Sequence, residues 1–342
     1  MSPAMVILQK IIGGTLIALL SIVIGLVFKG IDRKIHARMQ GRIGPPIWQP
    51  FWDLRKLMIK DSMVPENAVV WLFNAAPLIG LAATITILFY LPIGGLTPIA
   101  EGTGDLVLIL YLMTLPAVMM VLGGFASGSP FAIIGAQREM VMMMSYEFPL
   151  AAVIVTVAWK LNAALGPILQ VEGLKVFSLS TIAAYPVWSL VGFVGGMGMF
   201  ICLAVMLIVT PAELSKVPFD APDAHEELSG GVLVEYSGRN LALYYLMEAA
   251  KTVAVTSLTV AIFFPYGIAG LFGVTGLAAT VLDFGFFWVK VFIVMLVAVT
   301  FIRTAIARFK IDQIAHVFWA PVLALSLTGL LLVAVDHFLL FM

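Results

Sequence analysis

The sequence predicts an all-α, polytopic membrane protein of about eight transmembrane helices with an amphipathic cytoplasmic helix. Hydrophobic residues make up 62% of the 342 residues and charged residues only 11%, whereas ordinary soluble domains carry about 25% charged residues. Apolar runs of about 20 residues recur along the chain, the length that crosses a bilayer as a helix. The strict alternation of polar and apolar residues that marks a transmembrane barrel is absent.

The predicted spans follow one another without an internal repeat or a linker. They cover residues 6–28, 68–92, 106–125, 140–158, 186–209, 241–264, 284–302 and 317–341. The first run is too long for the core of a signal peptide and lacks a small-residue cleavage site, so we expect it to be a retained helix. We therefore expect a single membrane domain over residues 1–342.

Lysine and arginine predict the orientation of these spans. They concentrate in the loops that follow the odd-numbered spans, at about 29–67, 126–139, 210–240 and 303–316, while the opposite loops hold little beyond Lys160 and Lys175. Because positive charge marks the cytoplasmic side, these four loops are expected there, with both termini outside. The predicted location is the cytoplasmic membrane, crossed several times.

A short amphipathic segment lies in the first of these loops. Residues 48–60 alternate apolar positions such as Phe51 and Leu54 with charges such as Asp53 and Lys60. The pattern is typical of a helix lying in the membrane interface. A loop helix docked on the bundle would look the same, and both interpretations stay open.

Carboxylates crowd the loop after the fifth span. Six of the 19 acidic residues of the chain lie between positions 213 and 235. A cluster of acids at a membrane boundary is costly unless its members are solvated, paired or used, so a functional site is the default interpretation. The cluster consists of Glu213, Asp220, Asp223, Glu226, Glu227 and Glu235.

Four charged residues stand out inside predicted spans: Glu147, Glu248, Lys251 and Lys290. Glu248 and Lys251 are three residues apart, so both project from one side of their helix. Burial brings the pKa values of carboxylates and lysines toward neutrality, which suits groups that take and release protons. The sequence favours an ion relay, with a purely structural Glu248–Lys251 pair and a transporter substrate site as open alternatives.

Other kinds of site are not indicated. The net charge is zero, which gives no sign of nucleic-acid binding. The single cysteine, Cys202, excludes a disulfide framework, a cysteine-held zinc site or an iron–sulfur cluster within this chain. The four histidines lack metal-ligand spacing, so no metal site, cofactor or catalytic residue is predicted, and any redox centre must sit on a partner.

Several motifs, in order, resemble the H-type subunit of the respiratory complex I superfamily, which is the membrane subunit that joins the redox arm to the ion-pumping arm. The resemblance runs from the first span to the last. It rests on residues 32–45, Ser-Tyr-Glu at 145–147, Ala-Glu-Leu at 212–214, Pro-Phe-Asp at 218–220, Val-Glu-Tyr-Ser-Gly at 234–238 and residues 303–313.

Departures from the quinone-reducing pattern point to one branch of this superfamily. Gly44-Pro45 is followed directly by Pro-Ile-Trp and Gln49-Pro50, which shortens the loop that frames the quinone site in quinone-reducing members. Arg138 and Glu139 add a charge pair before the Ser-Tyr-Glu motif, and His225 stands where an acid is common. These features look like the membrane subunit of energy-converting (group 4) nickel–iron hydrogenases and of formate hydrogenlyase-type and sulfur-reducing complexes.

The resemblance implies a non-catalytic anchoring and coupling subunit that links electron transfer in a peripheral arm to translocation of protons or sodium ions. The implied partners are hydrogenase-like large and small subunits, a ferredoxin-like iron–sulfur subunit and antiporter-like membrane subunits, with the iron–sulfur clusters and nickel–iron site on those partners. The implied ion-relay residues are Glu147, Glu213, Asp220, Asp223, Glu226, Glu227, Glu235, Glu248 and Lys251. The implied docking residues for the redox arm are Arg33, Lys34, Arg38, Arg42, Arg138, Glu139, Arg239, Arg303, Arg308 and Asp312.

Two other functions stay open at this stage. A quinone-site membrane subunit of an NADH–quinone oxidoreductase-like complex would carry the same motifs. A stand-alone ion-coupled secondary transporter would use the acids as its substrate site, although spans 1–4 and 5–8 show no internal similarity of the kind that transporter repeats display.

Overall fold

The computed structural model describes residues 3–94, 96–100, 105–172 and 177–341, and this part is helical without strands. The predicted all-α class is therefore confirmed. The α-helices are α1 (Pro3–Met39), α2 (Gln49–Ile59), α3 (Val70–Tyr90), α4 (Asp105–Ala126), α5 (Pro130–Glu172), α6 (Leu179–Ala184), α7 (Phe193–Glu213), α8 (His225–Leu228), α9 (Gly238–Phe263), α10 (Leu277–Met295), α11 (Ile302–Ala305), α12 (Ile311–Val317) and α13 (Leu323–Phe341). Short 3₁₀ turns are η1 (Val187–Ser189), η2 (Ala221–Asp223), η3 (Gly231–Leu233) and η4 (Ala269–Phe272), and π-helical segments are η5 (Leu296–Phe301) and η6 (Phe318–Val322).

Eight helical segments of the described chain are long and apolar enough to cross a membrane, which confirms the predicted number of spans. Six are α1, α3, α4, α5, α7 and α9. The seventh runs through α10, η5 and α11, and the eighth through α12, η6 and α13. The last two spans thus each contain a π-helical turn, a feature that is often found where a helix serves a function.

Two predicted loops are shorter in the structure. Helix α1 continues to Met39, so the basic residues at 33–38 lie on a helix. Helix α5 begins at Pro130, and the expected loop at 126–139 reduces to residues 127–129. Proline is favoured at the first position of a helix because its missing N–H would be unpaired there in any case. Hydrophobicity alone places the start of this span too late, because the polar residues 137–139 separate the apolar first turns of α5 from the rest of the span.

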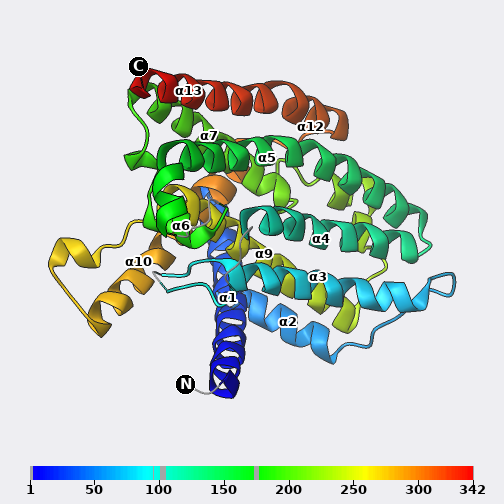
Figure 1. Ribbon diagram of the computed structural model, residues 1–342. Coiled ribbons are helices and arrows are strands. Elements are labelled where there is room, and N and C mark those ends of the chain that lie inside the picture. Colours follow the sequence, from blue (N-terminus) through cyan, green and yellow to red (C-terminus); the bar gives the residue numbers. More distant parts are fainter. Residues whose placement is uncertain (1–2, 95, 101–104, 173–176, 342) are drawn as a thin grey trace.

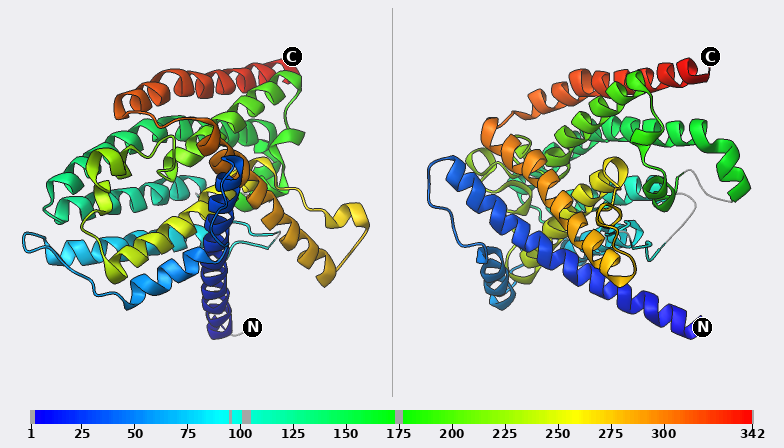
Figure 2. Two further views of the ribbon diagram at one scale, coloured as in Figure 1. Left: turned by 180° about the vertical axis from the view of Figure 1, so that it is seen from behind. Right: turned by 90° about the vertical axis from the view of Figure 1, so that its left-hand side faces the viewer.

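The long helices form layers that α1 crosses. Figure 1 shows α3, α4, α5 and α13 stacked with similar directions, with α1 crossing them at a steep angle. Helix α1 contacts the seventh span at η5 and α11, and α10 then diverges from α1 in Figure 1 and in the left-hand view of Figure 2. Helix α9 lies at the centre of the bundle. In its apolar stretch 83% of the residues are buried, whereas the value is 28% for the first and last spans.

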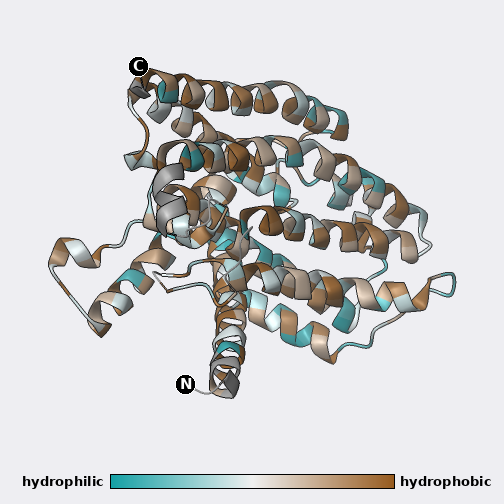
Figure 3. Cartoon of the chain, in the orientation of Figure 1, coloured by the Kyte–Doolittle hydropathy of each residue, from teal (hydrophilic) through white to brown (hydrophobic). Residues whose placement is uncertain are grey.

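The ends of the spans define two faces of the bundle. One face, the charged face, carries the C-terminal ends of α1, α7 and α11 and the N-terminal ends of α5, α9 and α12. The other, the opposite face, carries the C-terminal end of α9 and the N-terminal end of α10. Figure 3 shows apolar residues along most of the long helices, with hydrophilic residues on α2 and at a few positions within the helices.

Helix α2 is the amphipathic segment that the sequence predicts, and it has features of both a docked loop helix and an interfacial helix. It packs against α1 and α9, with Pro50 buried. Its exposed side still carries large apolar side chains, because Trp52 is 53% and Ile59 76% exposed. The helix is therefore docked on the bundle and keeps an apolar surface of the kind that lies in a membrane interface.

A buried ion pair ties three spans together near the opposite face. Lys160 of α5 donates to Asp336 of α13 at 3.1 Å, and the same carboxylate oxygen accepts the backbone N–H of Gly192 at 3.0 Å, just before α7. Lys160 is only 1% exposed. The expectation that Lys160 lies in a loop is wrong, because α5 extends past the apolar run; Lys175 lies outside the described residues.

The crossing of α1 and α9 is close enough to require glycine. A Cβ at Gly25 would meet the backbone carbonyl of Ala249. Small residues allow such backbone approach between membrane helices, where dispersion contacts supply most of the association energy.

We predict that Gly25→Ala lowers the thermal unfolding temperature of the purified protein, since a backbone atom cannot move aside as a side chain can. Gly285→Ala is the matched control, because a Cβ there meets nothing within 4 Å. That substitution should be neutral or stabilising by up to about 1 kcal/mol through helix propensity. Equal unfolding temperatures for wild type and Gly25→Ala, measured by scanning fluorimetry, would contradict the close packing.

Candidate functional site

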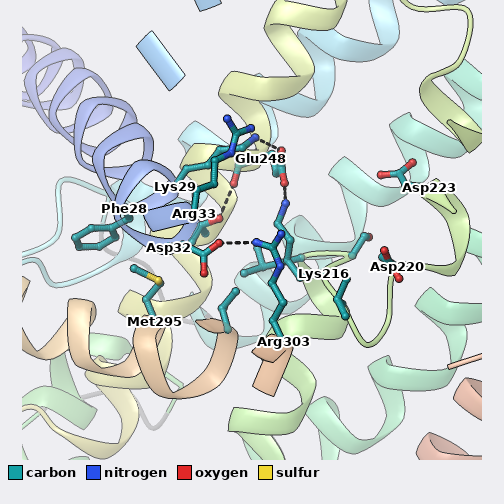
Figure 4. Close-up of a pocket in the computed structure, with 15 residues that line it drawn as sticks. Phe28, Lys29, Asp32, Arg33, Lys216, Asp220, Asp223, Glu248, Met295 and Arg303 are labelled. Carbon is teal, nitrogen blue, oxygen red and sulfur yellow. Dashed lines mark hydrogen bonds and ion pairs between the residues drawn. The ribbon is translucent and has the colours of Figure 1, made fainter. Parts of the chain in front are cut away.

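Charged residues from five parts of the chain meet at the charged face. They come from the last turns of α1, the end of α7, the segment 214–237 that follows it, the first half of α9, and the η5–α11 segment. Figure 4 shows these side chains pointing into a shared cavity. The segment 214–237 carries most of the acid cluster that the sequence indicates.

The charged cavity has a volume of about 260 Å³ and is lined by residues of all these elements. At its centre, the carboxylate of Glu248 is held between two ammonium groups (Figure 4). Lys29 of α1 donates to Oε2 at 2.5 Å, and Lys216 pairs with Oε1. A single carboxylate on α9 thereby connects α1 to the segment after α7.

Asp32 closes another side of the charged cavity. Its two oxygens accept from Thr300 at 2.8 Å and from Arg303 at 2.7 Å. Both donors belong to the seventh span, so this carboxylate joins α1 to the π-helical segment η5 and to α11. Charge-assisted hydrogen bonds of this kind are stronger than neutral ones.

A second, smaller cavity continues from the first toward the middle of the bundle. Its volume is about 50 Å³, which is room for a few water molecules. The two cavities share Leu214, Ser215, Asp223 and Glu248 in their walls. The inner cavity adds Glu139, Glu213 and Lys251, which we call the buried cluster.

The ion pair of the buried cluster sits at the end of α7. Glu213 is the last residue of that helix, 2% exposed, and Lys251 of α9 approaches its Oε1 to 2.9 Å. A carboxylate at a helix C-terminus faces the negative end of the helix dipole. Lys251 offsets that repulsion, and removing one partner from a buried pair typically costs about 3–5 kcal/mol.

Glu139 completes the buried cluster from α5 and is 1% exposed. Ser215 donates its hydroxyl to both carboxylate oxygens, at 3.3 and 3.4 Å. Ser215 has φ 48°, a left-handed conformation that is uncommon for residues other than glycine. The turn that ends α7 thus places a hydroxyl, which glycine lacks, against Glu139.

The buried cluster holds two carboxyl groups and one ammonium. If both carboxyls are ionised, the cluster carries a net charge of −1 away from bulk water; if they share one proton, it is neutral. Asp223, Glu213 and Lys251 are the charged groups that act electrostatically on Glu139. Groups coupled in this way take up and release protons as a set, so the cluster can store one proton.

Glu147 lies two turns further along α5 and is half-buried. Glu213 and Lys251 act on it electrostatically, and its Oε1 has no hydrogen-bond partner among the described residues. The structure thus brings Glu147 to the inner side of the buried cluster, as a relay requires.

Lys216 lies outside the spanning segments, on the wall of the charged cavity. The pKa of Lys216 is lowered to about 7, mainly because its ammonium is removed from bulk water and also because Lys29 and Arg303 nearby are positively charged. Its proton is therefore exchangeable near neutral pH, unlike that of an ordinary lysine, whose pKa is about 10.4.

Two arginines fix the segment after α7. Arg138 pairs with Glu227 at 2.5 Å and Arg308 with Asp220 at 2.6 Å. The backbone N–H of Phe309 also donates to the carbonyl of Pro218 at 3.0 Å. The acid-rich segment is thereby held against α5 on one side and against the connection between α11 and α12 on the other.

The structure changes several sequence-based assignments. Glu248 and Lys251 do not pair with each other: Lys251 faces α7, while Glu248 faces α1 and Lys216. Glu139 is too buried to dock a partner, and Arg138 pairs with Glu227 instead. These pairings arise because neighbouring positions of one helix face different helices.

The remaining assigned residues are spread over the charged face. Arg38, Arg42, Arg239 and Asp312 are exposed, and Arg33, Lys34 and Glu235 are partly exposed. Arg33 pairs with Asp53 of α2 at 3.1 Å, and Arg303 points into the charged cavity. Only the position of Glu226 in α8 is known, because its side chain is not among those described.

Four members of the site are not assigned a role by the sequence: Lys29, Asp32, Ser215 and Lys216. Lys29 directly follows the first apolar run, a position that marks it as a charge at membrane depth. Asp32 opens the motif at residues 32–45, which by itself indicates no role for this carboxylate. Nothing in the sequence reveals that Ser215 and Lys216 turn back toward α5 and α9. No cluster of metal-ligating side chains occurs among the described residues.

Comparison with known proteins supports one family along nearly the whole chain. The model of the NADH dehydrogenase family matches residues 12–334. An NADH-quinone oxidoreductase subunit of Thermomicrobium roseum is 32% identical over 91% of this chain and 92% of its own length. Hydrogenase-4 component C of Escherichia coli is 30% identical over 85% of this chain and 86% of its own.

A solved structure has the same fold. A chain in the membrane-bound sulfane sulfur reductase, an archaeal respiratory membrane complex, superposes with a TM-score of 0.81 at 26% identity, covering 95% of this chain and 99% of that one. These relatives confirm the sequence resemblance and the expectation of a membrane subunit in a redox-coupled complex. The chain is a multi-pass membrane protein that belongs to the NADH dehydrogenase family.

Proposed function

We propose that this chain is the anchoring and coupling subunit of an energy-converting hydrogenase-type complex, which links electron transfer in a peripheral arm to translocation of protons or sodium ions. The observation that carries the proposal is the continuous charged route from the charged cavity, through the shared wall at Glu248, to the buried cluster. Such a route is costly to keep in a membrane protein unless it is used.

The route can respond to charge outside the membrane. The exposed arginines of the charged face would dock the redox arm, and the segment 214–237 would lie beneath it. A nearby charge can shift the pKa of a buried carboxylate by about 1–3 units, and each unit corresponds to about 1.4 kcal/mol. A shift of that size changes whether the buried cluster holds its proton, and Glu147 is the next acceptor inward.

The proposal includes the orientation and the partners. The charged face would be cytoplasmic and both termini outside, as the basic loops indicate. Hydrogenase-like large and small subunits and an iron–sulfur subunit would hold the nickel–iron site and the clusters, and antiporter-like subunits would flank the bundle. The similarity to hydrogenase-4 component C and to the sulfane sulfur reductase chain supports this branch.

A quinone site is the second candidate, because several relatives are NADH-quinone oxidoreductase subunits. The lining of the charged cavity argues against it. Eight of its fifteen lining residues are charged, whereas pockets for small organic ligands are mostly apolar with a few polar groups. Quinone-dependent turnover of the purified complex, blocked by quinone-site inhibitors, would establish this candidate and remove the first.

A stand-alone transporter is the third candidate. It predicts ion uptake by this chain alone in liposomes. The coupling proposal predicts none, because ion movement would require electron flow through the attached subunits.

We predict that Glu213→Gln lowers the number of ions translocated per electron by about tenfold or more while electron transfer and assembly persist. The amide cannot carry the proton, and about 1.4 kcal/mol already corresponds to a factor of ten. The measurement is dye-monitored ion uptake in proteoliposomes that contain the intact complex, alongside its redox turnover.

The double variant Glu213→Gln/Lys251→Met guards against a trivial loss of stability, since it removes both charges of the pair. It should assemble and show the same uncoupling. Lys60→Gln, at an exposed position of the charged face, is the charge control and should behave as wild type. Normal coupling in both Glu213 variants would contradict the proposed ion relay through this residue.

Lys216 provides a pH-dependent test. Its pKa is lowered in the folded protein, so it releases its proton as pH rises through about 7. The unfolded chain keeps that proton until about 10.4, so this group favours the folded state increasingly over that window. We expect coupled turnover to show an ionisation near pH 7 that Lys216→Arg abolishes, because arginine stays charged.

Lys56→Arg, an exposed lysine on α2, serves as the control for the pH profile. Its profile should match that of wild type. An unchanged ionisation in Lys216→Arg would show that another group controls the pH dependence.

A further inference from the structure

Lys290, a charge inside the seventh span, takes no part in the proposed relay. It lies near the opposite face, where α9 ends, residues 264–276 form a connection that includes η4, and α10 begins. Together with Asp283, Phe264, Tyr266 and Gly267, it lines a cavity of about 210 Å³. This cavity shares no lining residue with the two cavities of the charged face.

The ammonium of Lys290 is held by backbone oxygens. It donates to the carbonyls of Phe264 and Tyr266, each at 2.7 Å. Phe264 directly follows the last residue of α9, so one of these carbonyls lies at the negative end of the helix dipole, where cations are favoured. The ring of Phe286 lies 5.0 Å from the ammonium and adds a cation–π contact.

Asp283 supplies the negative charge beside this position and is fixed in place. Its Oδ1 accepts the backbone N–H groups of Ile268 at 2.7 Å and Ala269 at 2.9 Å. A Cβ at Gly267 would lie 2.7 Å from the same oxygen, so the loop passes directly against the carboxylate. Asp283 is also the charged group that acts electrostatically on Lys290.

We propose that the carbonyl oxygens of Phe264 and Tyr266, with the carboxylate of Asp283 nearby, form a binding site for a monovalent cation such as Na⁺ or K⁺; in this structure the ammonium of Lys290 occupies the two carbonyl oxygens as a tethered cation. Carbonyl and carboxylate oxygens are the ligands that hard cations prefer, and backbone carbonyls can replace the hydration shell of an alkali ion. A single carboxylate matches a single positive charge, whereas calcium sites gather several carboxylates. The adjoining cavity gives a hydrated ion a place to enter.

Exchange of the tethered cation for a free one would remove the contact between Lys290 of α10 and the end of α9, while Asp283 keeps its bonds to the loop. The same span carries Thr300, in the π-helical segment η5, and Arg303, in α11, which together hold Asp32 in the charged cavity. Cation occupancy at the opposite face can therefore act on the charged cavity through one continuous span. The site itself rests on its own geometry and stands if the relay through Glu213 fails.

The test uses the intact purified complex with Lys290→Met, which keeps an unbranched side chain one atom shorter than lysine and leaves the carbonyl oxygens without the ammonium. Its unfolding temperature is measured in sodium, potassium and choline chloride at equal ionic strength. We expect a saturable rise when sodium or potassium replaces choline, and none after Asp283→Asn is added. Lys10→Met, which removes an exposed lysine from the N-terminal part of α1, should respond equally to all three salts.

A second measurement needs no variant. If alkali ions compete with Lys290 for the oxygens, sodium or potassium but not choline should speed the labelling of Lys290 in the wild-type complex by a small amine-reactive ester, quantified by mass spectrometry. An assembled Lys290→Met complex with the same unfolding temperature in all three salts would overturn the proposal. If that variant does not assemble, a labelling rate independent of the salt would overturn it.

Discussion

The burial of Glu213 against Lys251 is the interaction on which the site depends. A charge taken out of water must be paired or neutralised, and α7 and α9 bring these two opposite charges together. Helix α7 ends at Glu213, and α9, the most buried span, delivers Lys251. The turn after α7 then places Ser215 against Glu139, a second carboxyl group on which Lys251 also acts electrostatically. Because the buried cluster has one lysine for two acids, its net charge depends on whether one proton is bound.

The rest of the charged face follows from the same constraint. Lys29 and Lys216 share Glu248, and Thr300 and Arg303 satisfy Asp32. Each of these contacts joins segments that are distant in sequence, so the charges also set how the spans meet. A change in the charge of one group therefore alters contacts between helices, which is the property that a coupling subunit needs. Tight helix crossings, such as Gly25 against Ala249, keep the bundle rigid enough to transmit that change.

Much of the fold could be predicted from the sequence, because hydrophobic length determines membrane spans. All eight spans and the amphipathic helix are predicted correctly, since apolar runs of about 20 residues have few alternative structures. The first turns of α5 are missed because the polar residues 137–139 interrupt the apolar sequence there. Buried Lys160 is missed for a related reason: its partner Asp336 lies 176 positions away, and no local pattern predicts that pairing. Within the site, Glu213, Glu248 and Lys251 can be recognised from the sequence because charged residues are rare in membrane spans. Their ion-pair partners cannot, because these depend on which helix each side of α9 faces.

The central claim is that the buried cluster changes its protonation when the attached redox arm changes its charge. Infrared difference spectra of the intact complex, reduced against oxidised, test it most directly, because a protonated carboxyl group has its own stretching band. The account predicts a carboxyl band in wild type that disappears in Glu213→Gln or in Glu139→Gln and stays in Lys60→Gln. A band that is unchanged in both cluster variants, or no carboxyl band in wild type, would contradict it.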